Sequence, residues 1–133
     1  MNISEARTFD EVLAEQLQDP EFRTEWERTA LARAVANAVI KYRLERKLSQ
    51  RKLAEQLGWK QPAVARLEVA ENNPSFATLC DLAQKLGIEL VLDITPKGPQ
   101  SAWFNPEPSD TAVLESTELA DGTRIAFATR PAA

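Results

Sequence analysis

The sequence contains no histidine and only one cysteine, and both shortages restrict its chemistry. Without histidine, a Ser-His or Cys-His catalytic pair and a His-based metal site are excluded. The aspartates and glutamates show no cluster whose spacing indicates a carboxylate metal site or a catalytic acid pair. We therefore expect no enzyme activity, no catalytic residue, no metal and no cofactor.

The single cysteine, Cys80, also rules out a disulfide within the chain. It lies beside Leu79 and Leu82 in a segment whose apolar residues recur at helical spacing. We therefore predict that Cys80 is a buried thiol rather than a reactive one.

The chain also lacks any apolar run long enough to span a membrane. Its first residues, MNISEARTFDEV, are polar and acidic, unlike a secretory signal. Hydrophobic residues make up 44% and charged residues 27%, as in globular proteins, and 133 residues suit one compact domain with extensions. We expect a cytoplasmic protein that does not bind membranes.

The net charge of −4 conceals three segments of different sign. Residues 1–28 hold eight acids and three bases (−5), residues 29–70 nine bases and three acids (+6), and residues 71–133 nine acids and four bases (−5). A cationic segment of this kind can neutralise the phosphates of a nucleic acid. The acidic ends suit a different, basic partner.

Residues 50–69, QRKLAEQLGWKQPAVARLEV, have the spacing of two helices that cross steeply. Ala54 stands where the two backbones approach most closely, and Gly58 stands at the corner, where a left-handed backbone conformation favours glycine. An ordinary amphipathic helical hairpin would share part of this pattern, but the glycine, the alanine and five apolar positions together favour a DNA-binding helix-turn-helix. The apolar positions are Leu53, Leu57, Trp59, Val64 and Leu67.

The second helix of this motif is expected to begin near Gln61 and to present a surface that reads bases in the major groove. Gln61 and Ala63 are the strongest candidates for contact with base edges. For Asn72 and Asn73, ordinary turn chemistry is an equal alternative to phosphate contact. The predicted DNA-binding residues are Gln50, Arg51, Lys52, Lys60, Gln61, Ala63, Arg66, Asn72 and Asn73.

The phrases LSQRKLAEQLG, ARLE and NNPSFATLCDLAQKLGI, between about Leu31 and Leu92, resemble the Cro/CI-type repressor domain of the XRE family. The resemblance implies a five-helix core, and it implies that Gln50 both binds a phosphate and braces the recognition helix. It also implies a structural ion pair for Glu68, with Arg51 or Lys52 as candidate partner. Lys60 departs from the usual Ser or Thr cap, and Pro62 takes an early helical position where a missing N–H costs nothing.

The remaining segments extend this core on both sides. Residues 1–28 are predicted to form an acidic helical arm that begins at the cap Thr8 and restarts at Asp19-Pro20. The following stretch to Lys47 contains no Pro or Gly, which indicates one long helix or two end to end.

After Gly87, the alternation of IELVLDI predicts an edge strand that must pair either with a second copy of itself or with the tail. We predict dimerisation through Ile88, Leu90, Leu92 and Ile94. Residues 95–110 form a Pro-rich linker, and Asp121-Gly122 predicts a hairpin within residues 111–133. The expected fold is thus mainly α, with a helix-turn-helix domain at 29–94, a helical arm, an edge strand and a hairpin tail.

The arm with its DPEFRTEWE phrase and the ELVLDI strand resemble the antitoxins of HigBA-type and related toxin–antitoxin pairs. This resemblance implies a homodimer that represses its own double-stranded operator and covers a basic RelE/HigB-like ribonuclease toxin. The alternatives are a stand-alone or phage-type repressor, an adaptor without DNA binding, and an arm that only folds back on its own core. The predicted toxin-binding residues are Phe9, Leu13, Leu17, Phe22 and Trp26.

Overall fold

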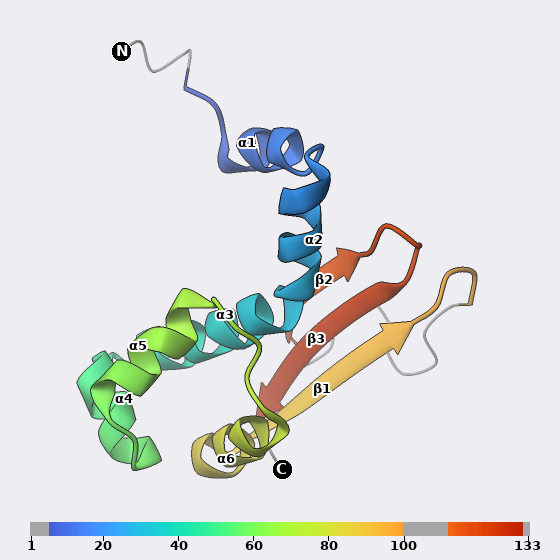
Figure 1. The fold of residues 1–133 in the computed structure, drawn as a ribbon. Coiled ribbons are helices and arrows are strands. Elements are labelled where there is room, and N and C mark those ends of the chain that lie inside the picture. The colour runs from blue at the N-terminus through green and yellow to red at the C-terminus, as the bar shows by residue number, and fades with distance from the viewer. Residues whose placement is uncertain (1–5, 100–111, 132–133) are drawn as a thin grey trace.

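Six helices and three strands make up the residues that this computed structural model describes, which are 6–99 and 112–131. The helices α3 to α6 and the sheet lie together, and α1 and α2 extend away from them (Figure 1). None of the described helices has the length and apolar character needed to cross a bilayer. The elements are α1 (Phe9–Gln16), α2 (Pro20–Arg28), α3 (Ala30–Glu45), α4 (Gln50–Leu57), α5 (Gln61–Val69), α6 (Phe76–Leu86), β1 (Ile88–Thr95), β2 (Ala112–Glu118) and β3 (Arg124–Pro131).

Side chains cap the start of α1, α2, α4 and α6, and at α1 and α2 they do so where the sequence predicts it. Thr8 and Glu11 form a capping box at α1, and Asp19 accepts the Glu21 N–H at 3.0 Å, ahead of α2. Ser49 and Ser75 cap α4 and α6 by accepting backbone N–H groups, each at 3.1 Å. These bonds satisfy N–H groups that the helices themselves leave unpaired.

The stretch without Pro or Gly forms two helices rather than one. The chain leaves helical geometry at Thr29, with φ −101° and ψ 17°, and α3 begins at the next residue. Five alanines of α3 are buried and are spaced two residues apart, so they lie on more than one side of the helix. Helix α3 accordingly contacts α5 and also β2 and β3.

The mainly helical fold class is confirmed, but residues 29–94 contain four helices rather than the five that the resemblance implied. After Gly87 (φ 64°) the chain continues as strand β1, because the apolar residues there recur every second position. The core includes the predicted positions, with Leu53, Leu57 and Val64 fully buried and Trp59 and Leu67 packed against them.

The prediction of a buried Cys80 is wrong, because this side chain is exposed. Leu82 and Leu86 form the buried face of α6, and Leu79 packs against the same core. Cys80 follows Leu79 by one residue, which turns it about 100° around the helix axis and away from that face.

The hairpin at Asp121-Gly122 is present, and it joins β1 in one antiparallel sheet of order β1-β3-β2. Asp121 accepts the Thr123 N–H at 2.8 Å, and Gly122 has φ 89°, which few residues other than glycine adopt. The sequence left two possible partners for β1, a second copy of itself and the tail, and in the structure β1 pairs with the tail strand β3. The predicted linker lies mostly outside the described residues.

Strand β3 is the centre of this sheet, and it contributes to the core of the helical domain. Phe127 is only 2% exposed and packs in one cluster with residues of α3, α4, α5 and α6. The C-terminal hairpin is therefore part of the same folded unit as the helix-turn-helix.

Candidate nucleic-acid interface

The two helices of the predicted motif meet at a tight corner. Helix α4 ends at Gly58, whose φ of 69° is the left-handed conformation predicted for it. The backbone N–H of Trp59 returns to the Ala54 carbonyl at 2.9 Å, which closes the end of α4. Helix α5 then begins at Gln61, as predicted.

The outer face of α5 offers polar and small side chains to solvent. Gln61, Pro62 and Arg66 are exposed, Ala63 is half-buried, and Val64 points into the core. The Gln61 amide donates to the Gln50 side-chain oxygen at 2.9 Å. Gln50 therefore braces the start of α5, which confirms that part of its expected role.

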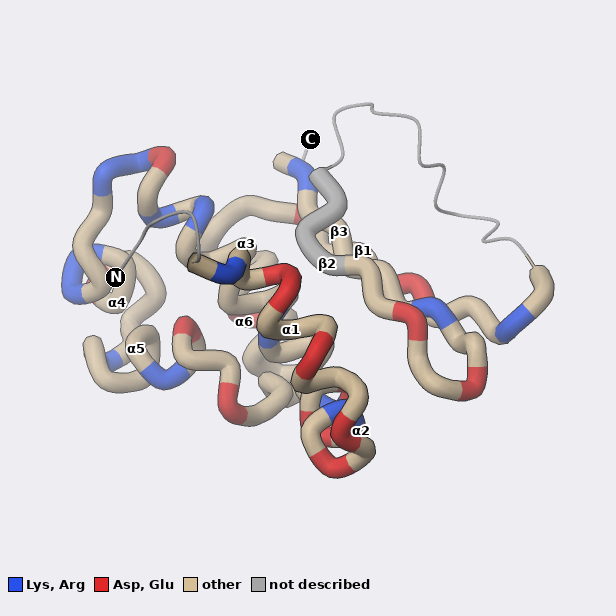
Figure 2. The backbone as a smooth tube through the Cα atoms, turned by 90° about the horizontal axis from the view of Figure 1, so that it is seen from above, with Lys and Arg blue, Asp and Glu red and all other residues tan. Residues whose placement is uncertain are grey.

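Cationic side chains surround this face. Figure 2 shows Lys and Arg gathered around α4 and α5, whereas Asp and Glu are concentrated on α1 and α2. Arg51 and Lys52 are exposed and pair loosely with Glu55, at 3.9 and 3.7 Å. Such surface pairs contribute little free energy, so both cations are available to phosphates. Lys60 is the N-cap of α5 and makes no side-chain capping bond, because a lysine side chain has no atom that can accept one.

Arg43 and Glu68 form an ion pair that connects α3 to the end of α5. Arg43 donates to the Glu68 carboxylate at 2.9 Å from Nη2 and 3.2 Å from Nε, and the two side chains are 19% and 7% exposed. The expectation that Arg51 or Lys52 pairs with Glu68 is therefore wrong. The true partner is 25 residues away in sequence, a separation that no local pattern reveals.

Asn73 has a structural role at the junction of α2 and α3. Its amide oxygen accepts the Ala32 N–H at 3.0 Å, and its amide nitrogen donates to the Arg28 carbonyl at 2.7 Å. These partners lie 41 and 45 residues away in sequence, so the bonds are not the local turn chemistry considered as the alternative to phosphate contact, and the DNA contact of Asn73 stays a prediction. Asn72 is exposed and stays a predicted contact.

A second set of contacts, not predicted from the sequence, holds the corner of the motif against α6. The Trp59 indole N–H donates to Asp81 at 2.8 Å, and Lys85 donates to the Leu57 carbonyl at 2.6 Å while pairing with Asp81 at 3.1 Å. The hydrogen bond from Trp59, then those from Lys85, hold the pKa of Asp81 below its ordinary value. This contribution to stability is present above the ordinary pKa of aspartate and is lost as pH falls below it.

The predicted toxin-binding residues lie on an arm that adds nothing to the buried core. Neither α1 nor α2 has a buried residue, and Phe9 is 74% exposed. Phe22 and Trp26 stack with ring centres 6.1 Å apart, and the Arg33 guanidinium of α3 lies 3.5 Å from the centre of a Trp26 ring. The arm thus meets the helical domain near Trp26.

The four predicted dimerisation residues divide into two pairs. Ile88 and Leu90 pack partly against the core of their own chain, whereas Leu92 and Ile94 are exposed. One edge of β1 pairs with β3, and among the described strands nothing pairs with its other edge. Ile88 and Leu90 are therefore partly engaged with their own core, and the dimer contact through the four residues stays a prediction.

Comparison with known protein families finds a match over the segment that contains the predicted motif. Residues 39–92, from the second half of α3 into β1, match the model of a helix-turn-helix family. No curated protein and no solved structure matches the chain. The matched segment contains α4, α5 and α6, so it includes the two helices and the corner of the predicted motif.

Proposed function

We propose that this chain is an antitoxin that binds and represses its own operator and neutralises a small, basic ribonuclease of the RelE/HigB-like kind. The observation that carries the DNA-binding part is the exposed face of α5, where Gln50 braces Gln61 at 2.9 Å among cationic side chains. In this proposal Gln61 and Ala63 contact base edges. Arg51, Lys52, Lys60, Arg66 and Asn72 contact phosphates.

We further propose that the protein binds DNA as a homodimer whose half-sites lie one helical turn, about 34 Å, apart. The open edge of β1 supports this, because an unpaired strand edge offers backbone groups that a second copy can bond. The exposed side chain of Leu92 adds apolar surface on the same strand.

Replacing Gln61 with alanine is expected to weaken operator binding by about 1–3 kcal/mol and to relax the preference at one base position. Lys52→Ala is expected to weaken binding to all sequences alike and to reduce the salt dependence by about one ion, because a phosphate contact carries no base identity. Titration of operator and scrambled DNA at several salt concentrations distinguishes the two. Gln84→Ala, an exposed glutamine on α6, is the control. Equal losses on both DNAs for Gln61→Ala contradict base reading.

The antitoxin part of the proposal is supported by the arm. Residues 6–28 carry seven acids and three bases (−4), and their apolar stripe is not buried in the core. The acids of the arm are partly paired within the chain, since Glu15 pairs with Arg7, and Glu25 with Arg28 at 2.9 Å. The arm's net charge, rather than a set of unpaired carboxylates, therefore supports attraction of a basic protein.

A chain that lacks residues 1–18 loses α1 but keeps the Asp19 cap, α2 and the contact between Trp26 and Arg33. We expect it to bind operator like the full chain, and to lose binding to the basic protein encoded beside it together with the ability to restore growth. Gel shifts, calorimetry and a growth assay with both proteins expressed measure these effects. Full restoration of growth, or an adjacent protein that is not toxic, favours the stand-alone repressor instead.

A further inference from the structure

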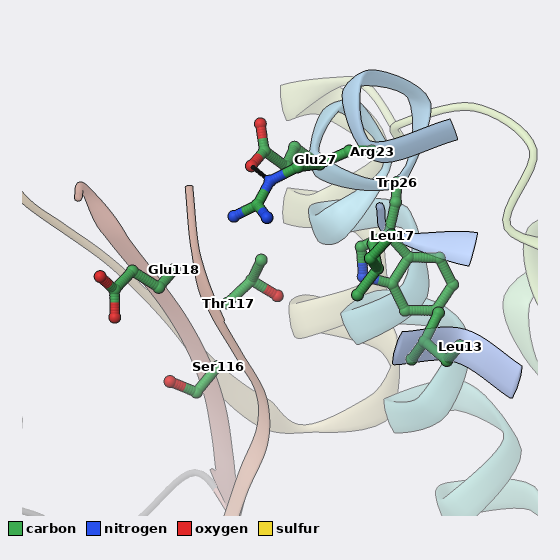
Figure 3. Close-up of a pocket in the computed structure, with 8 residues that line it drawn as sticks. All are labelled: Leu13, Leu17, Arg23, Trp26, Glu27, Ser116, Thr117 and Glu118. Atoms are coloured by element: carbon green, nitrogen blue, oxygen red, sulfur yellow. Dashed lines mark hydrogen bonds and ion pairs between the residues drawn. The ribbon is translucent and has the colours of Figure 1, made fainter. Parts of the chain in front are cut away.

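An open pocket of about 290 Å³ lies between the arm and the second strand of the sheet. Figure 3 shows the side chains of α1 and α2 on one side of it and those of β2 on the other. Small-molecule sites usually bury most of the ligand's surface, so a pocket that is open rather than enclosed suits one or two side chains of a protein better than a free ligand. It is lined by Leu13, Leu17, Arg23, Trp26, Glu27, Ser116, Thr117 and Glu118.

The wall formed by the arm is apolar and partly rigid. Leu13 and Leu17 belong to a stripe at helical spacing that continues along α1 to Val12 and Phe9, both exposed. The Trp26 ring is held by two contacts, since it stacks with Phe22 and has the Arg33 guanidinium 3.5 Å from a ring centre. A held aromatic ring beside half-buried leucines is typical of an anchor site for another protein.

The sheet forms the opposite wall. In Figure 3 the Thr117 side chain points toward Leu17 and Trp26, whereas those of Ser116 and Glu118 point away, as strand alternation requires. Thr117 is paired with Ile125, and Ile125 with Ile94, so these three side chains form a row across one face of the sheet. The row ends at Ile94, which is 64% exposed.

We call the pocket between Leu13, Leu17 and Trp26 on one side and Thr117 on the other the arm–sheet groove. The charges around it indicate which kind of molecule it binds. Residues 6–28 carry −4, and the hairpin at 112–131, with three acids and two bases, carries −1. The cations of the helix-turn-helix lie on α4 and α5, away from α1 and α2 (Figure 2). An acidic surround disfavours nucleic acid and favours a basic protein.

We propose that the arm–sheet groove binds apolar side chains of the basic partner protein, so that the C-terminal sheet forms half of the partner's binding site. This inference rests on the antitoxin function proposed above and extends it. The hairpin then has two roles, since its Phe127 completes the core while its Thr117 and Ile125 face the partner.

The test uses the full chain with one tryptophan substitution inside the groove and one outside it. Thr117→Trp fills the groove, whereas Ala120→Trp places the same ring at an exposed turn position of the same hairpin that does not line the groove. The probe is the purified product of the small basic reading frame that adjoins this gene, measured by calorimetry. We expect Thr117→Trp to lower its affinity by at least about tenfold and Ala120→Trp by less than about threefold. Both variants should bind operator DNA unchanged.

Two further variants cover the case in which Thr117→Trp does not fold. Leu17→Ser and Ile94→Ser alter opposite walls at positions that are not buried, and each should lower partner affinity several-fold without changing the melting temperature by more than a few degrees.

The outcomes separate this inference from the function on which it rests. If truncation of the arm abolishes partner binding while Thr117→Trp and Ile94→Ser leave it unchanged, the antitoxin function stands and the groove is overturned. If no adjacent basic protein exists or none binds the unaltered chain, the antitoxin function and the groove proposal are both contradicted. If Thr117→Trp converts a dimer of this chain to monomers in sedimentation, the occupant is a second copy and the proposal is overturned.

Discussion

Replacing Phe127 with alanine is expected to lower the free energy of unfolding by about 3–5 kcal/mol, the usual cost of emptying a large aromatic site in a core. Phe127 is 2% exposed and packs with residues from four helices, although it belongs to the tail hairpin. Because small domains are stable by only about 5–15 kcal/mol, operator binding at 37 °C should also fall. Urea denaturation followed by circular dichroism measures the change.

The control for this variant is Ile94→Ala, which removes a large apolar side chain from the same sheet at an exposed position. It should change stability by no more than about 0.5 kcal/mol. A loss below about 1 kcal/mol for Phe127→Ala contradicts the placement of the hairpin in the core. In that case a chain ending near residue 99 should be as stable as the full one.

The substitution Glu68→Ala is expected to cost about 3 kcal/mol, because it leaves the Arg43 guanidinium largely buried without its anion. We take the lower end of the usual range of about 3–5 kcal/mol, since the Arg43 side chain keeps 19% exposure. The pair holds the end of α5 to α3, so binding to operator should weaken even where the variant remains folded.

The double variant Arg43→Met/Glu68→Leu tests whether the cost of Glu68→Ala comes from leaving a buried charge without its partner. It should recover most of the lost stability, because removing both charges leaves no buried ion. A double-mutant cycle in urea measures the coupling. If Glu68→Ala costs less than about 1 kcal/mol, the pair is too hydrated to fix the recognition helix.

Local features of the structure follow directly from the sequence. Gly58 and Gly87 end helices in left-handed geometry, and Ser49, Ser75, Thr8 and Asp19 begin them, because caps depend only on neighbouring backbone groups. The helix-turn-helix spacing was likewise readable, since its buried positions are set by the helical repeat within 20 residues. The brace from Gln50 to Gln61 could be expected only from the family resemblance.

The sequence by itself thus determined the helices, their caps, the corner of the motif and the charge of each segment. Only the tertiary structure decided that Glu68 pairs with Arg43, that Asn73 joins α2 to α3, that Cys80 faces solvent and that Phe127 completes the core. The first group depends on interactions within a few residues, where backbone geometry limits the possibilities. The second depends on contacts between distant segments or on which face of a helix the rest of the chain covers, and many pairings satisfy the same local pattern until the whole chain is packed.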